Sequence, residues 1–167
     1  MPAIPTSVTS TATSFQPAFQ RVQQSGDFDC AFACIAAIAS KASPEEVRDI
    51  AIKKFRHPAH GPYWITGDLI SGLLAHYGYV ATVFKESAKV TDLPDLAIAL
   101  VEYDAETEVG RHVLFHRAKA SHDPKTVIEY MIDPAYWVDA KEQVRTDFKG
   151  LTPSWYIGIH AMNKPSK

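Results

Sequence analysis

The pattern of apolar and polar positions changes its period near the middle of the chain. Residues 30–39 are apolar or small on every side, which is typical of a helix buried all round. Residues 43–55 and 66–77 carry apolar side chains at helical spacing, each behind an N-cap signal, Ser43-Pro44-Glu45 or Thr66. Gly78 follows at a position suited to a left-handed C-terminal residue. The first half of the chain is therefore expected to be helical.

After residue 78 the apolar runs shorten to strand length. Five segments are expected to be strands, at residues 80–84, 96–103, 112–117, 126–133 and 155–162. The third and fourth are joined by a polar connection with a turn signal, which favours a hairpin, and residues 139–148 suit a short helix or irregular cover. Helices followed by strands predict an α+β domain, in which a helical half packs on a C-terminal antiparallel sheet.

The chain reads as one domain, residues 18–167, behind a flexible arm rich in Ser, Thr and Pro at residues 1–17. The composition, with 46% hydrophobic and 22% charged residues, suits a globular core. A net charge of −2 argues against nucleic acid as a partner, and no apolar run reaches the roughly 18 residues of a membrane span. The absence of a signal peptide indicates the cytoplasm. The alternative is secretion by a signal-peptide-independent system, which a Ser/Thr-rich leader would fit.

Two cysteines, too few for a disulfide framework, stand four apart at the front of the buried segment. Cys30 follows a plausible N-cap, Asp29, and a helix N-terminus favours the thiolate. Cys34 lies one turn deeper, where it is expected only to pack. The spacing is wrong for a redox pair. Two thiolates on one helix are also a poor metal site, for which only His57 and His60 lie in one nearby loop, so we expect no cofactor.

Gln24 stands six residues before Cys30, across a loop that holds a glycine and two aspartates. A thioacyl reaction passes through an oxyanion, which the backbone N–H of the nucleophile and a nearby side-chain amide can stabilise. A histidine that can serve as a base begins the third expected strand at His112, and His116 on the same face is its alternative.

These residues resemble the papain-like cysteine peptidases, and within them the bacteriocin-processing (double-glycine leader) peptidases and their peptidase-like relatives. The likeness rests on Gln24, the segment Asp29-Cys30 to Cys34-Ile35, Gly110-Arg111-His112 before an apolar strand, and Ile132-Asp133-Pro134. It covers roughly residues 20–160. The chain departs from the family's pattern at Ala31, where a glycine is usual, at Arg111, which separates the glycine from the histidine, and in a long hairpin loop at 118–125.

The resemblance implies a papain-like fold and a triad of Cys30, His112 and Asp133 with Gln24 in the oxyanion hole. His112 would act as general base, and Asp133 would accept a hydrogen bond from its other ring nitrogen. Asp133 could instead cap the turn before Pro134. In that case Asp139 is the alternative residue for orienting His112. The aromatic side chains that flank the expected cleft are candidates for substrate binding, namely Tyr63, Trp64, Tyr136 and Trp137.

The expected function is a cysteine peptidase that cleaves peptide or amide bonds through a thioester on Cys30, acts on a protein or peptide and works under reducing conditions. The chain has no Walker A motif, so a free-standing domain is expected. Two alternatives stay open. One is a papain-like deamidase or acyl transferase that acts as a secreted bacterial effector or toxin. The other is a non-catalytic peptide-binding domain. Oligomeric state has no signal in the sequence.

Overall fold

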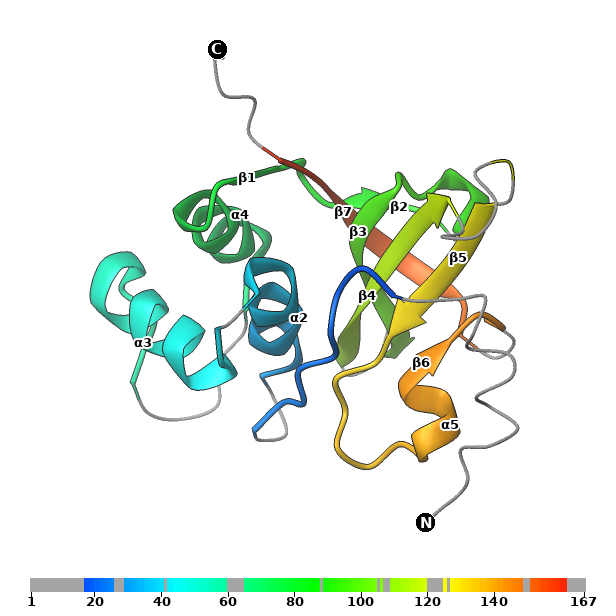
Figure 1. Ribbon diagram of the computed structural model, residues 1–167. Helices are drawn as coiled ribbons and strands as arrows, with labels where there is room; N and C mark the ends of the chain where they lie inside the picture. The colour runs from blue at the N-terminus through cyan, green and yellow to red at the C-terminus, as the bar shows by residue number, and fades with distance from the viewer. Residues whose placement is uncertain are drawn as a thin grey trace.

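The structure is a computed structural model, in which residues 17–25, 29–40, 42–59, 65–87, 89–104, 106, 109–119, 125, 127–148 and 151–161 are described. Most of the N-terminal arm, together with His60, Tyr63 and Trp64, lies outside these ranges. The helices come first, as expected: α2 (Cys30–Ala39), α3 (Pro44–Phe55) and α4 (Gly67–His76). A sheet and a few short elements follow (Figure 1). The expected α+β class is thus confirmed at this level.

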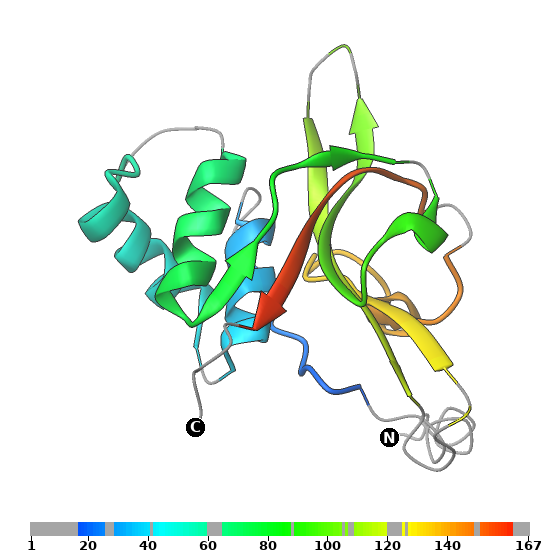
Figure 2. The ribbon, with the colours of Figure 1, turned by 90° about the horizontal axis from the view of Figure 1, so that it is seen from above.

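The sheet is antiparallel and has the order β1-β7-β3-β4-β5-β6, with β2 paired to β7. Its strands are β1 (Tyr79–Ala81), β2 (Lys85–Glu86), β3 (Leu96–Asp104), β4 (Val109–Lys119), β5 (Val127–Ile132), β6 (Val144–Arg145) and β7 (Pro153–Ala161). The expected hairpin is β4–β5, in which Leu114 pairs with Ile132. The helices lie to one side of the sheet, with α2 nearest to it (Figure 2).

Each face of the sheet has its own core. Leu114, Ile132 and Tyr130 face α2 and join a cluster with its side chains Phe32, Ile35 and others. Val113, Phe115 and Met131 alternate with them and form a second cluster on the other face, closed by Leu151 and Phe148. Because side chains alternate along a strand, even-numbered residues of β4 face the helices and odd-numbered ones face away.

The helix starts follow the signals in the sequence. Ser43 Oγ accepts a hydrogen bond from Glu46 N at 3.1 Å, and Thr66 Oγ1 accepts one from Leu69 N at 3.1 Å. Pro44 stands at the start of α3, where its missing N–H has no intrahelical partner to lose. Gly78 has a φ of +93°, so the glycine meets a real conformational need after α4.

Several expectations on elements need correction. Residues 82–84 are not part of a strand, since β1 ends at Ala81. The short helix expected after residue 139 is α5 (Ala140–Gln143), and it runs directly into β6. The sequence pattern missed β2 and the 3-10 helix η1 (Val90–Asp92), which are too short to show a period. Asp29 stands at the N-cap of α2, but its side chain makes no cap hydrogen bond.

Candidate functional site

The first turn of α2 brings Cys30 to the start of the helix-facing side of β4. Cys30 Sγ lies 3.5 Å from His112 Nδ1, and the backbone N–H of His112 donates to the same sulfur at 3.2 Å. The two residues are 82 positions apart in the sequence. The predicted pairing of Cys30 with His112 is therefore present in the structure as a close thiol–imidazole contact.

The surroundings of this pair are mostly apolar. The thiol is buried, and the His112 ring lies 6.4 Å from the ring of Phe84, centroid to centroid. Burial lowers the pKa of His112 to about 4, so its imidazole is neutral at pH 7. Burial also raises the pKa of the Cys30 thiol, against the opposing effect of backbone N–H groups of His112 and Ala31. At rest the pair is a thiol beside a neutral imidazole, whereas the helix N-terminus alone had favoured a thiolate.

The two rival residues take other roles. Cys34 is 2% exposed and lies in the core cluster of α2, where burial raises the pKa of its thiol well above the usual range. His116 points to the same face as His112, but its Nδ1 lies 2.8 Å from Tyr130 Oη, and Phe19 packs edge-on against its ring. Neither is placed beside Cys30 in the way that His112 is.

Gln24 is buried and lies on the segment that leads into α2. It is 3% exposed, and its backbone N–H donates to Pro134 O at 2.9 Å. Asp29 Oδ2 accepts a hydrogen bond from Ser25 N at 2.8 Å, which links this segment to the residue before Cys30. The Asp29 side chain therefore bonds Ser25 and does not make the expected cap of α2. In Figure 1 the segment 17–25, in blue, runs from the β5 side of the sheet to the foot of α2.

The expected hydrogen bond between Asp133 and His112 is not made. Asp133 Oδ1 instead meets Arg111 Nη1 at 2.5 Å and accepts from Ala135 N at 3.1 Å. Within the described residues, the ring of His112 has no carboxylate partner. The reason is the register of the sheet: since Leu114 pairs with Ile132, alternation sends the next side chain, Asp133, to the face away from His112. The site brings together a dyad and not the expected triad.

Arg111 and Glu102 are residues that the sequence analysis did not place in the site. Glu102 holds Arg111 through two bonds, Nε to Oε1 at 2.7 Å and Nη2 to Oε2 at 3.2 Å, while Arg111 also holds Asp133. The available signal was the departure from the family's pattern at Arg111. This arginine, which stands between Gly110 and His112, is the residue that forms the ion pair with Asp133.

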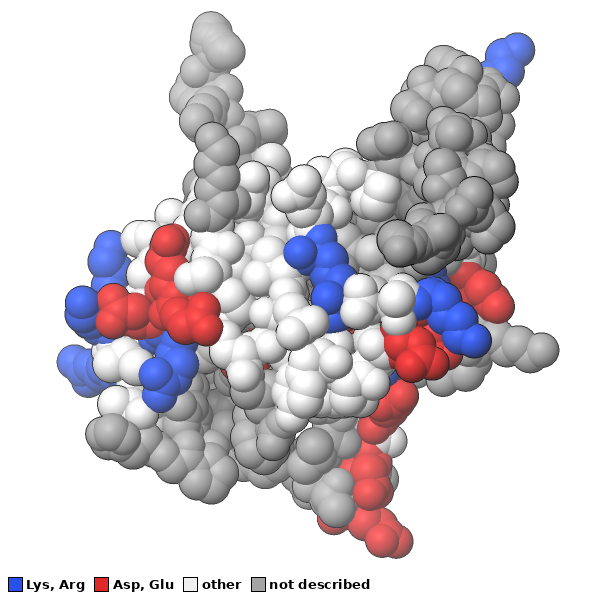
Figure 3. All heavy atoms as spheres, turned by 60° about the horizontal axis from the view of Figure 1, so that its bottom comes forward, with Lys and Arg blue, Asp and Glu red and all other residues white. Residues whose placement is uncertain are grey.

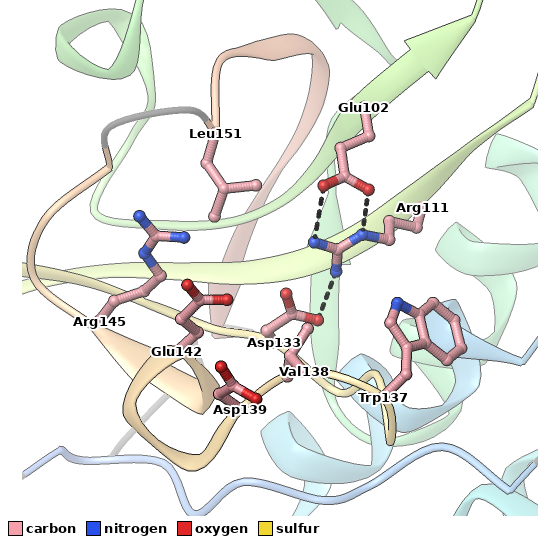
Figure 4. Close-up of a pocket in the computed structure, with 9 residues that line it drawn as sticks. All are labelled: Glu102, Arg111, Asp133, Trp137, Val138, Asp139, Glu142, Arg145 and Leu151. Carbon is pink, nitrogen blue, oxygen red and sulfur yellow. Dashed lines mark hydrogen bonds and ion pairs between the residues drawn. The ribbon is translucent and has the colours of Figure 1, made fainter.

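A pocket of about 290 Å³ opens on this ionic network (Figure 4). Nine residues line it, and neither Cys30 nor His112 is among them: Glu102, Arg111, Asp133, Trp137, Val138, Asp139, Glu142, Arg145 and Leu151. Asp139 therefore lies with Asp133 around this pocket and has no hydrogen bond to His112.

Tyr136, predicted to bind substrate, is 48% exposed and packs edge-on against Trp137 with ring centroids 4.9 Å apart. Tyr63 and Trp64 are outside the described residues, so their expected role stays a prediction.

The part of the chain that the structure describes shows neither a cluster of metal ligands nor a membrane-spanning helix. No group of three or more His, Cys, Asp or Glu side chains there is arranged to hold a metal ion. No helix in the described ranges is long and apolar enough to cross a membrane. On the face in Figure 3, positive and negative side chains are mixed, most densely at the end that carries α3, with an uncharged area beside them.

Comparison of the sequence with protein-family models and with curated proteins finds no match. The contact between Cys30 and His112 is therefore the main guide to function.

Proposed function

We propose that the chain is a thiol-dependent hydrolase of amide bonds, most simply a cysteine peptidase of papain-like type, with Cys30 as nucleophile and His112 as general base. The observation that carries the proposal is the 3.5 Å approach of Cys30 Sγ to His112 Nδ1 at the N-terminus of a buried helix. A nucleophile within reach of a base, at a helix end with free N–H groups, is the arrangement that acyl transfer needs.

In the proposed reaction His112 Nδ1 takes the thiol proton as Cys30 Sγ attacks the carbonyl carbon of the substrate. The resulting oxyanion is stabilised by backbone N–H groups in the first turn of α2 and by the Gln24 amide. His112 returns the proton to the leaving amine, the C–N bond breaks and a thioester remains. Water then attacks the thioester and gives its proton to His112, and the thiol leaves with that proton. The product is a free acid.

The neutral resting His112 is in the protonation state that a general base needs. A histidine with a pKa of about 4 stays unprotonated above that pH and can accept the thiol proton. Because the thiol is buried and the His112 ring is desolvated, the charged pair is formed only as the substrate is attacked. A dyad without an orienting carboxylate should give lower rates than a triad, since that third group is worth a large factor in triads.

The test is a peptide library digested under reducing conditions, with new N-termini identified by mass spectrometry. We expect the wild-type protein to cleave and Cys30→Ala to be inactive, because only the former has the nucleophile. Cys34→Ala is the matched control, since it removes the other thiol of the same helix, one turn away, and is expected to stay active. Equal product from wild type and Cys30→Ala would reject the proposal.

The same assay separates the proposal from a deamidase. Ammonia released in a Cys30-dependent way without new N-termini would mean that the thioester forms on a glutamine or asparagine side chain. Binding of peptides with no product of either kind would favour a peptide-binding domain.

A further inference from the structure

Arg111 and Asp133 form a buried charged pair. The Arg111 side chain is 14% exposed and that of Asp133 is 2% exposed, and Glu102 on β3 brings a second carboxylate to the same guanidinium. The close-up shows Arg111 between the two carboxylates (Figure 4). Glu102 reaches this place from an irregular point of β3, where the register with β4 shifts and its φ is +55°. Bulged strands commonly re-aim a side chain in this way.

Asp133 connects this pair to a short segment, residues 133–135. Its Oδ1 also accepts from Ala135 N at 3.1 Å, which folds the segment back on the carboxylate. On its other side the segment offers three backbone carbonyl groups to the chain before α2. Arg21 donates Nε to Asp133 O at 2.6 Å and Nη2 to Ala135 O at 2.7 Å.

The third carbonyl belongs to Pro134, which accepts the backbone N–H of Gln24 at 2.9 Å. Gln24 is therefore held by a segment whose own position depends on Asp133. Ser25, the next residue, donates its backbone N–H to Asp29 Oδ2, so a shift at Gln24 is passed over a short distance toward Cys30. A continuous set of contacts thus joins Arg111 to the start of α2 without passing through His112.

We propose that Arg111 and Asp133 are positioning residues for Gln24. They act through the segment 133–135, and Asp133 does not orient His112. The inference rests on the proposed function for the role of Gln24, but the mechanical link can be measured without catalysis. Removing one partner from a buried pair leaves an uncompensated charge, so the loss of Arg111 should displace Asp133 and loosen the segment that it holds.

The first test measures amide hydrogen exchange at Gln24 in Arg111→Met and in wild type. We expect exchange to be about tenfold faster in the variant, because the acceptor Pro134 O is no longer fixed. Arg117→Met is the matched control. Arg117 lies on the same strand and face and also bridges two carboxylates, those of Asp95 and Glu129, yet among the described residues it makes no hydrogen bond or ion pair to residues 133–135. Equal Gln24 exchange in Arg111→Met and wild type would overturn the inference. Arg111→Lys takes its place if the Met variant does not fold.

The second test uses the Cys30-dependent activity. Arg111→Met should lower kcat by about tenfold to a hundredfold with little change in KM, and should have no further effect in a Gln24→Ala background. The acid limb of the pH profile should stay where it is. Additive losses, or a shifted acid limb, would show that Asp133 acts on His112 and would overturn the inference. If the wild type has no Cys30-dependent turnover, the proposed function fails, and the exchange result alone decides the positioning role.

Discussion

At the scale of single residues, the state of His112 decides how the site can work. A thiolate–imidazolium pair at rest would need two charges in an apolar, buried place, and neither the sheet nor the segment 133–135 gives His112 a carboxylate. The effect of burial is thus larger than that of the helix N-terminus. Burial raises the pKa of Cys30 and lowers that of His112. In the proposed reaction the proton would therefore move during the attack on the substrate and not before it.

His112 should therefore make the protein less stable in acid. Its pKa is about 4 in the folded protein and near 6.5 unfolded, so between these values the unfolded chain binds more protons. Stability should fall as the pH drops from 6.5 toward 4, by about 2 kcal/mol between pH 7 and 4.5 from this residue. Urea unfolding at the two pH values measures this change.

The comparison needs His112→Gln, because burial also lowers the pKa of His57 and His116 and both add to the wild-type slope. The variant should lose about 2 kcal/mol less than wild type over the same pH range, whatever its absolute stability. An equal loss in both proteins would contradict the neutral, buried state of His112.

The sequence identified Cys30 and His112 but not the partner of Asp133, for a physical reason. A cysteine at a helix start and a histidine near a strand start are local features. The face to which Asp133 points depends on how β5 is paired with β4, and a shift by one residue would reverse it. Hairpin register is set by the connecting turn, and that connection is long here, so the sequence did not define it.

At the scale of elements, the helices were predictable because their ends carry chemical signals. Ser43-Pro44-Glu45 and Thr66 define the starts of α3 and α4 to within a residue. The central strands β3, β4, β5 and β7 were found from apolar runs, whereas β2 and β6 are two residues each and depend on pairing with a longer neighbour. Pairing of this kind has no local pattern.

The cap of α3 gives a direct check at this scale. Ser43→Ala removes the acceptor for Glu46 N and should lower the free energy of unfolding by about 1 kcal/mol. Ser43→Asp should restore most of it, since a carboxylate also accepts at this position and suits the helix N-terminus. Thermal and urea unfolding of the three proteins provide the measurement. An alanine variant as stable as wild type would mean that water or another group replaces the hydroxyl.

At the scale of the whole molecule, one sheet carries both cores and so connects the site with the rest of the domain. The helix-facing core fixes α2, and with it Cys30, against β4, while the other core fixes the strands that hold the Arg111–Asp133 pair. His112 and Arg111 are adjacent in the chain and belong to opposite faces. Any change that shifts β4 should therefore affect the dyad and the ionic network together.

Leu114 and Phe115 test this coupling, since they are adjacent on β4, fully buried and in different cores. Leu114→Ala and Phe115→Ala should each destabilise the protein by about 3 kcal/mol through lost burial and a cavity. If the sheet joins the cores into one cooperative unit, each variant should still unfold in a single transition, with far-UV circular dichroism and tryptophan fluorescence coincident. Separate transitions for the two probes in Phe115→Ala would show that the helix-facing half, with the Cys30–His112 pair, remains folded when the second core is lost, and the two faces would then be independent units.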